Sequence, residues 1–140
     1  MSLPPVNLAA VVAGTALSFV SGFAWFGPKT FYPTWWRLMG RGTNEAPGGR
    51  TPMPIAFGSV IVGQFLQVLT LAFVLSALGP AIASGIDGAL VGLLLGAGIA
   101  AGSSLSHRIF AGHGFGVWVI EVGNDIVNLG LAGYLLAIIK

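Results

Sequence analysis

The chain has 140 residues, of which 55% are hydrophobic and only 7% are charged. An average soluble protein has about 25% charged residues, so these side chains are too few to cover a water-facing surface. We therefore predict an integral membrane protein that forms one domain over residues 1–140. Because the chain has no cysteine, disulfide, thiolate-metal and cysteine-nucleophile chemistry are excluded. The net charge of +2 comes without a basic face, so we expect no nucleic-acid partner.

Four apolar stretches are each long enough to cross about 30 Å of hydrocarbon, which takes about 20 helical residues. We place these helices at residues 6–26, 55–78, 88–107 and 116–139. Proline and glycine separate the stretches, as expected at the ends of helices. The predicted fold class is therefore all-α, an integral membrane four-helix bundle. A cleaved signal peptide is the alternative for the first stretch, but it has no basic start and no small-residue cleavage site after it.

The connection between the first two predicted helices, residues 27–54, has two parts of different composition. Aromatic and basic residues alternate in the first part, which suits a short segment lying among lipid headgroups. The interfacial anchor that we predict there consists of Trp35, Trp36, Arg37 and Arg41. A dedicated site for a lipid or a partner is the alternative. Residues 42–52 are rich in glycine, proline and polar residues and are predicted to be a mobile linker.

Lysine and arginine gather on one side of the predicted helices. The residues that share this side are Lys29, Arg37, Arg41, Arg50 and Arg108, whereas the other side holds Asp87, Lys140 and the termini. Cytoplasmic loops of membrane proteins carry an excess of positive residues. We therefore expect both basic loops in the cytoplasm and both termini outside it.

Small residues recur at every fourth or seventh position in three of the predicted helices. Such rows allow the close backbone approach on which helix association in lipid depends. The packing glycines that we predict are Gly14 and Gly22 in the first helix, Gly92 and Gly96 in the third, and Gly123 and Gly130 in the fourth. So many rows of small residues favour a homo-oligomer, or contact with another membrane protein. The alternative is that helix packing inside a single bundle accounts for all of these rows.

Polar residues occupy one face of the fourth predicted helix. Four polar residues share this face: Glu121, Asn124, Asp125 and Asn128. At 100° per residue, their side chains fall within about 100° of arc, opposite the glycines of the same helix. A carboxylate near mid-membrane costs about 2.5 to 3.5 kcal/mol, so this face should point into protein or water. Gln64 and Gln67 of the second helix lie at matching depths, roughly 13 and 18 Å. The predicted cytoplasm-facing pocket is lined by Gln64, Gln67, Glu121, Asn124, Asp125 and Asn128.

Two interpretations of this polar face remain open. The groups could satisfy one another and only set helix register, or they could form a site, which two acidic residues on one face favour. Arg108 could hold Glu121 ionised as an ion pair. His107 and His113 do not have the spacing of metal ligands, so we expect no metal, and no motif indicates a cofactor or a catalytic residue.

Three segments resemble the DUF1761 family of small bacterial membrane proteins. They are residues 22–28 (Gly-Phe-Ala-Trp-Phe-Gly-Pro), residues 35–40 (Trp-Trp-Arg-Leu-Met-Gly) and the Ile120-Glu121-x-Gly123 segment. The resemblance covers nearly the full length and implies four membrane helices in a bacterial inner membrane, with no known activity. Aromatic and histidine residues often follow the last glycine in the family, where this chain has Asn124 and Asp125.

Three function classes follow from these patterns. The first is a small transporter or gated pore for a small solute or proton, with Glu121 and Asp125 as its ionisable pair. The second is a structural or lipid-binding subunit that assembles through its glycine faces, with membrane lipids as its surroundings. An intramembrane enzyme is third, because no nucleophile or metal set supports it.

Overall fold

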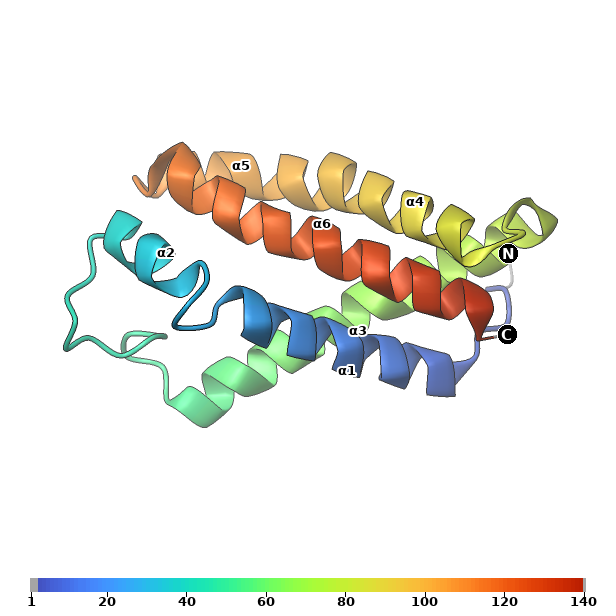
Figure 1. Ribbon diagram of the computed structural model, residues 1–140, viewed down its shortest axis with the longest axis horizontal. Coiled ribbons are helices and arrows are strands. Elements are labelled where there is room, and N and C mark those ends of the chain that lie inside the picture. Colours follow the sequence, from blue (N-terminus) through green and yellow to red (C-terminus); the bar gives the residue numbers. More distant parts are fainter. Residues whose placement is uncertain (1–2, 140) are drawn as a thin grey trace.

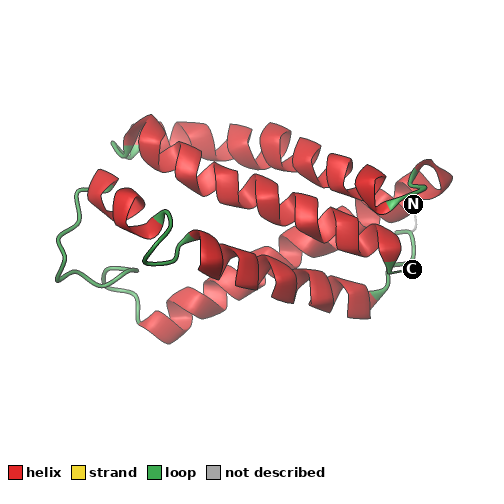
Figure 2. Ribbon diagram, in the orientation of Figure 1, coloured by secondary structure: helices red, strands yellow, loops and turns green. Residues whose placement is uncertain are grey.

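The computed structural model describes residues 3–139, and every regular element in that range is helical, as Figures 1 and 2 show. The elements in chain order are α1 (Leu8–Trp25), α2 (Tyr32–Leu38), α3 (Met53–Leu78), η1 (Gly79–Ala81), α4 (Gly85–Leu95), η2 (Gly96–Ala100), α5 (Ala101–Phe110) and α6 (Gly114–Ile138). The all-α prediction is confirmed. Four helical segments are long and apolar enough to cross a membrane: α1, α3 with η1, α4 through α5, and α6. Lys140 and residues 1–2 of the predicted domain lie outside the described residues.

Two helices, α1 and α4, begin at other residues than predicted because side-chain caps set their starts. The Asn7 side chain accepts hydrogen bonds from the amides of Ala9 and Ala10, so α1 begins at Leu8 instead of residue 6. A capping box between Ser84 and Asp87 starts α4 at Gly85, three residues before the predicted start. The second and fourth predicted helices also begin earlier, at Met53 and Gly114, while the third continues to Phe110.

The helices run up and down between two ends of the molecule (Figure 1). One end holds α2, the loop that follows it and the turn between α5 and α6; we call it the α2 end. The other end holds both termini and the connection between α3 and α4. Gly79 at φ +52° ends α3, and Gly112 and Gly114 at φ +77° form the turn before α6, conformations that favour glycine.

The last helix, α6, is the centre of the fold, since α1, α2, α3, α4 and α5 all contact it. The apolar core lies between α1, α3 and α6 toward the end with the termini. Its fully buried members include Val11, Val68, Leu71 and Ala132. Apolar side chains are therefore tightly packed at this level of the bundle.

Glycines bring α4 and α6 into backbone contact. A Cβ atom built on Gly92 would overlap the Leu129 carbonyl, and one on Gly88 would overlap the Gly133 carbonyl. One on Gly96 would lie 2.8 Å from the Ile126 Cα. These glycines of the predicted third-helix row thus have partners inside the chain. They supply no argument for an oligomer.

A π-helical turn, η2, interrupts the third apolar segment between α4 and α5. Such a turn inserts one extra residue into a helix and rotates everything after it. The buried face therefore passes from Gly96 to Ala101 instead of continuing to Ala100. A row continued from Gly92 and Gly96 at every fourth residue would reach Ala100, and the π-helical turn breaks that row after Gly96.

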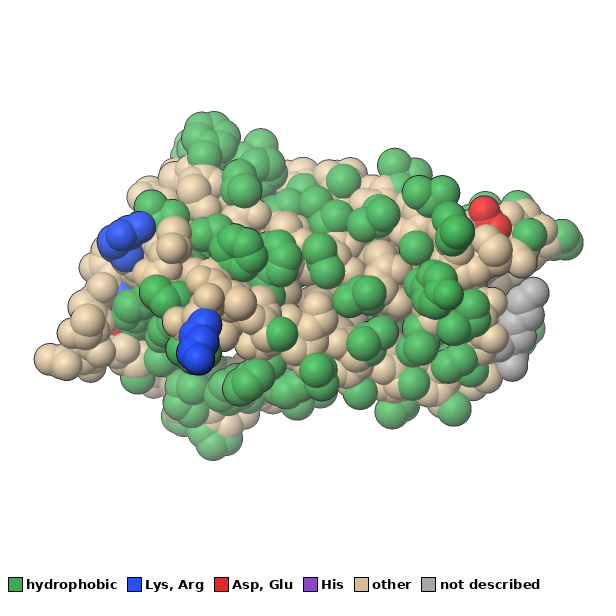
Figure 3. Space-filling model, in the orientation of Figure 1, with side chains coloured by type: hydrophobic (Ala, Val, Ile, Leu, Met, Phe, Trp, Pro, Cys, Tyr) green, Lys and Arg blue, Asp and Glu red, His purple; other side chains and the backbone are tan. Residues whose placement is uncertain are grey.

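The surface shows how charge is distributed along the molecule. In Figure 3, lysine and arginine side chains lie at the α2 end, an acidic one lies near the opposite end, and the length between them is apolar. Large hydrophobic side chains such as Val12, Val20, Leu66, Leu90 and Leu94 are more than half exposed there. A patch of this extent is far larger than a water-soluble monomer normally exposes.

Candidate functional site

A cavity of about 600 Å³ lies between the helices in the half of the molecule near α2. It is lined by residues from α1, α2, α3, α5 and α6 and by Pro47 of the loop before α3. Of the predicted pocket residues, the ones that line it are Gln64, Gln67, Glu121, Asn124 and Asp125. Asn128 does not line it but is buried one turn further along α6, at 1% exposure. The structure thus brings together residues of helices that are far apart in sequence.

Several side-chain amides around this cavity lack hydrogen-bond partners. The oxygen atoms of Gln64, Gln67 and Asn124 are buried without a partner among the described residues, and so are both polar atoms of the Asn128 amide. Gln64 and Asn124 are 9% and 7% exposed. An unsatisfied buried polar group costs about 1 to 3 kcal/mol, and natural proteins tolerate few of them. These atoms have almost no accessible surface, so water or a guest in the cavity reaches them only when the amide side chains turn.

An ion pair closes one wall of the cavity. The Arg108 Nε atom of α5 lies 2.5 Å from the Glu121 Oε2 atom of α6. The other carboxylate oxygen, Oε1, accepts a hydrogen bond of 2.9 Å from the Trp35 indole. Both Glu121 oxygens are therefore engaged, and Arg108 also lies 3.3 Å from the His113 Nδ1 atom. Asp125, one turn along the same face, makes neither an ion pair nor a hydrogen bond with any described residue.

The residues of the predicted interfacial anchor have different surroundings in the structure. The Trp35 ring lines the cavity and binds Glu121, and Trp36 is buried at 8% exposure with its indole donating to the Gly42 carbonyl. Arg37 is exposed. Arg41 pairs with Glu45 at 2.9 Å, and its hydrogen bond lowers the pKa of the Glu45 carboxyl. The physical reason is that an indole N–H needs an acceptor, and the folded chain offers one.

Aromatic side chains form much of the remaining cavity wall, and the sequence interpretation did not include them in the pocket. Phe19 and Phe23 lie on α1 and Phe26 directly follows its last residue; Tyr32 and Phe57 come from α2 and α3. The first three phenylalanines follow each other at spacings of four and three, which places them on one helical face. That spacing was the available signal.

The predicted packing glycines lie against different neighbours. A Cβ on Gly14 would be 3.0 Å from Val68 Cγ1, and one on Gly22 would be 3.6 Å from the Asn124 side-chain oxygen at the cavity. A Cβ on Gly123 would be 2.9 Å from the Trp25 ring, and one on Gly130 2.8 Å from the Leu93 side chain. Gly22 therefore leaves room beside the polar face of α6.

A comparison with family models bears directly on the identity of the chain. The model of the family described as "Protein of unknown function (DUF1761)" matches residues 9–137. The chain belongs to the DUF1761 family. Every residue that lines the cavity lies inside the matched segment, so the cavity is part of the DUF1761 region and not of an appended tail. No curated protein and no solved structure matches the chain.

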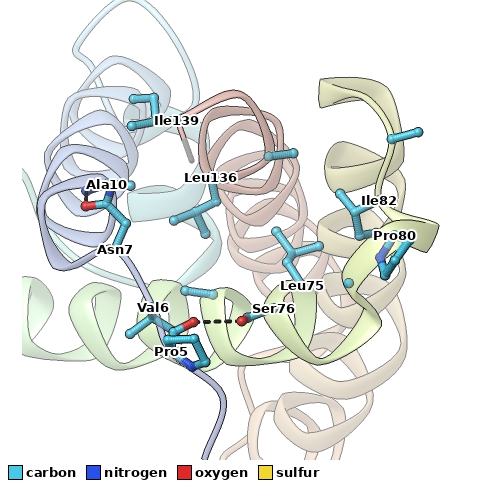
Figure 4. A pocket seen from close by; sticks show the side chains of 14 residues that line it. Pro5, Val6, Asn7, Ala10, Leu75, Ser76, Pro80, Ile82, Leu136 and Ile139 are labelled. Carbon is cyan, nitrogen blue, oxygen red and sulfur yellow. Dashed lines mark hydrogen bonds between the residues drawn. The ribbon is translucent and has the colours of Figure 1, made fainter.

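A second cavity in this DUF1761 chain, of about 630 Å³, lies at the end that holds the termini (Figure 4). Its lining includes Leu75, Ile82 and Leu136, and among residues 3–139 no charged side chain takes part. Its polar groups are already engaged: Ser76 donates to the Pro5 carbonyl at 2.7 Å, and Asn7 caps α1. We therefore assign the candidate site of this family member to the cavity beside Asp125.

Within residues 3–139, no three histidine or acidic side chains come close enough to hold a metal ion together. His113 contacts Arg108 instead, and its position beside a guanidinium disfavours a cation.

Proposed function

We propose that the chain is an integral membrane protein whose four long helical segments cross the bilayer as a bundle. The shortest, α1, has 18 residues and spans about 27 Å at 1.5 Å per residue, close to the hydrocarbon thickness. The exposed leucine, valine and isoleucine side chains along the middle of the molecule support this, because lipid is the only solvent that favours them.

We further propose that the α2 end faces the cytoplasm of a bacterium and that the chain lies in the inner membrane. Lys29, Arg37, Arg41 and Arg50 precede α3, and Arg108 lies at the end of α5. Short loops with this excess of positive charge stay in the cytoplasm, which would put both termini outside.

Our proposal for the activity is transport of a small solute through the cavity beside Asp125, by a carrier or a gated pore. The observation that carries it is the cluster of buried amides without partners around a space of about 600 Å³. The core of Val11, Val68, Leu71 and Ala132 separates this cavity from the one at the end with the termini. A polar site separated from the opposite side by apolar packing is typical of one state of a transporter.

A cysteine at Ser104 tests this proposal by thiol labelling, since the chain has no cysteine of its own to give background reactivity. Ser104 lines the cavity, while Ser103 beside it is exposed on the outer surface of α5 and does not line it. In proteoliposomes with one protein orientation, we expect Ser104→Cys to react with a membrane-impermeant thiol reagent added on the side of the α2 end. We also expect this thiol to react with reagent added on the opposite side, because a transporter must also open there. That reaction should be at least about tenfold slower.

The matched control is Ser103→Cys, which we expect to stay unreactive because a thiol facing lipid meets no water-soluble reagent. Reaction of Ser104→Cys from the α2 side alone would exclude transport and leave a binding pocket. An unreactive Ser104→Cys would show a dry helix contact and remove the proposed function altogether.

A second candidate function is a membrane subunit that assembles with copies of itself or with another membrane protein. The observation that favours it is that Gly98 and Gly102, four residues apart, have no atom within 4 Å of the position that a Cβ would take. Glycines at this spacing on an open helix face often form contacts between helices in membranes.

Bulky residues at this open face separate the second candidate from the first. Gly102→Leu meets no obstacle inside the chain, so we expect it to leave the fold intact and to lower any oligomer mass measured by light scattering in detergent. Gly58→Leu on α3 is the matched control, because Gly58 also has no neighbour within 4 Å, does not line the cavity and lacks a glycine four residues away. An unchanged mass for Gly102→Leu would remove this face as an interface.

A further inference from the structure

The ionisable groups that line the cavity do not balance. They are one guanidinium, Arg108, and two carboxylates, Glu121 and Asp125. Arg108 pairs with Glu121, so the ionised form of Asp125 adds a negative charge without a counter-ion in residues 3–139. A charge in a membrane-embedded site needs a partner, since an isolated one is expensive to hold there. The cavity therefore attracts a positively charged molecule.

The amides beside Asp125 provide acceptors for the hydrogen atoms of such a molecule once the side chains turn their buried oxygen atoms toward it. Gln64 and Asn124 are more than nine-tenths buried, line the cavity, and have oxygen atoms without a donor. The Gln67 oxygen is also buried without a donor and comes from the next turn of α3. An ammonium group has hydrogen atoms to donate and no lone pair to accept with, which fits a carboxylate surrounded by amide oxygens.

The rest of the wall fits an organic body better than a bare metal ion. The rings of Phe19, Phe26, Tyr32, Trp35 and Phe57 line the same space, and aromatic faces attract organic cations. The cavity volume of about 600 Å³ lies in the range of sites for small molecules, whereas a metal ion needs oxygen ligands within about 2.6 Å on several sides. The combination of one unpaired carboxylate, free amide oxygens and aromatic rings is specific to a cation with an apolar part.

We propose that this cavity binds a small organic cation, with its ammonium group at Asp125 and the buried amides and its apolar part against the aromatic rings. The inference rests on the proposed function, because it names the class of solute for the same cavity. The Arg108–Glu121 pair positions the wall and keeps one carboxylate away from the ligand, so that Asp125 alone provides the counter-charge.

Three probes of similar size and different charge test this class: 2-phenylethylammonium, 2-phenylethanol and phenylacetate. Their binding to the full chain in lipid nanodiscs is measured by isothermal titration calorimetry. We expect the ammonium compound to bind at least about tenfold more tightly than the alcohol, with no binding of the carboxylate, because only the first neutralises Asp125. Asp125→Asn should abolish the difference between the first two probes, and Asp125→Glu should restore it.

Glu45→Gln is the control for a general effect of one lost carboxylate, because Glu45 lies in the exposed loop and does not line the cavity. It should bind the three probes like the unchanged chain. Equal binding of all three probes, a preference that persists in Asp125→Asn, or no binding of the ammonium compound would each overturn the cation assignment. Reactivity of Ser104→Cys from both sides would still support transport in those cases, so the two failures can be told apart.

Discussion

Alanine in place of Gly92 is expected to destabilise the fold by about 3 kcal/mol, the upper part of the range for overpacked sites. The added Cβ would overlap the Leu129 carbonyl, and backbone on the facing helix cannot rotate away as a side chain can. The helices α4 and α6 must then move apart along their whole contact, which also opens the contacts of Gly88 and Gly133. The measurement is the unfolding free energy in mixed micelles, obtained by denaturant titration and followed by circular dichroism.

The matched control for this prediction is Gly102→Ala in the same apolar segment. Gly102 has no atom within 4 Å of a Cβ position, so alanine there should be neutral or should stabilise α5 by up to about 1 kcal/mol through its helix propensity. Equal effects of the two substitutions would contradict the α4–α6 contact described above.

Removal of the Arg108 charge is expected to lower the unfolding free energy more than removal of the Glu121 charge. Arg108→Met leaves the Glu121 carboxylate, whose side chain is 18% exposed, without its cation, and we expect a loss of about 2 to 3 kcal/mol. In Glu121→Gln, Arg108 at 35% exposure can extend toward the headgroups, so the loss should be about 1 kcal/mol. The double variant should lose less than the sum of the two single variants.

A double-mutant cycle of unfolding free energies measures this coupling. We expect an interaction energy of about 1 to 2 kcal/mol, in the range for residues in direct contact. Additive effects would show that the two side chains do not form a stabilising pair. Trp35→Phe provides a further variant, because it removes the hydrogen bond to the Glu121 Oε1 atom while leaving the ion pair in place.

Composition and the spacing of apolar stretches were enough to predict an all-α chain with four long apolar helices. These properties are local, since they depend on how many consecutive residues avoid charge and where proline and glycine interrupt them. The helix ends were less accurate by up to three residues. Side-chain caps such as those of Asn7 and Asp87 set those ends, and propensity alone does not reveal them.

The polar face of α6 followed from helical periodicity, and the matching depths placed Gln64 and Gln67 across from it. The sequence predicted one of the two partners of Glu121. Arg108 could be predicted because it lies close to the short turn between α5 and α6, whereas Trp35 is 86 residues from Glu121 in sequence. Loop paths determine such contacts. No local pattern contains them.

The sequence by itself determined the all-α class of this protein, its four long apolar helical segments, its membership of the DUF1761 family and the polar residues that interrupt those segments. Only the tertiary structure decided what those residues face. The π-helical turn rotated α5 by the equivalent of one residue, and the contacts of Gly88 and Gly92 occupied the rows that had indicated an oligomer. The physical reason is that periodicity states which residues share a face, while packing against other helices decides whether that face meets protein, lipid or an open cavity.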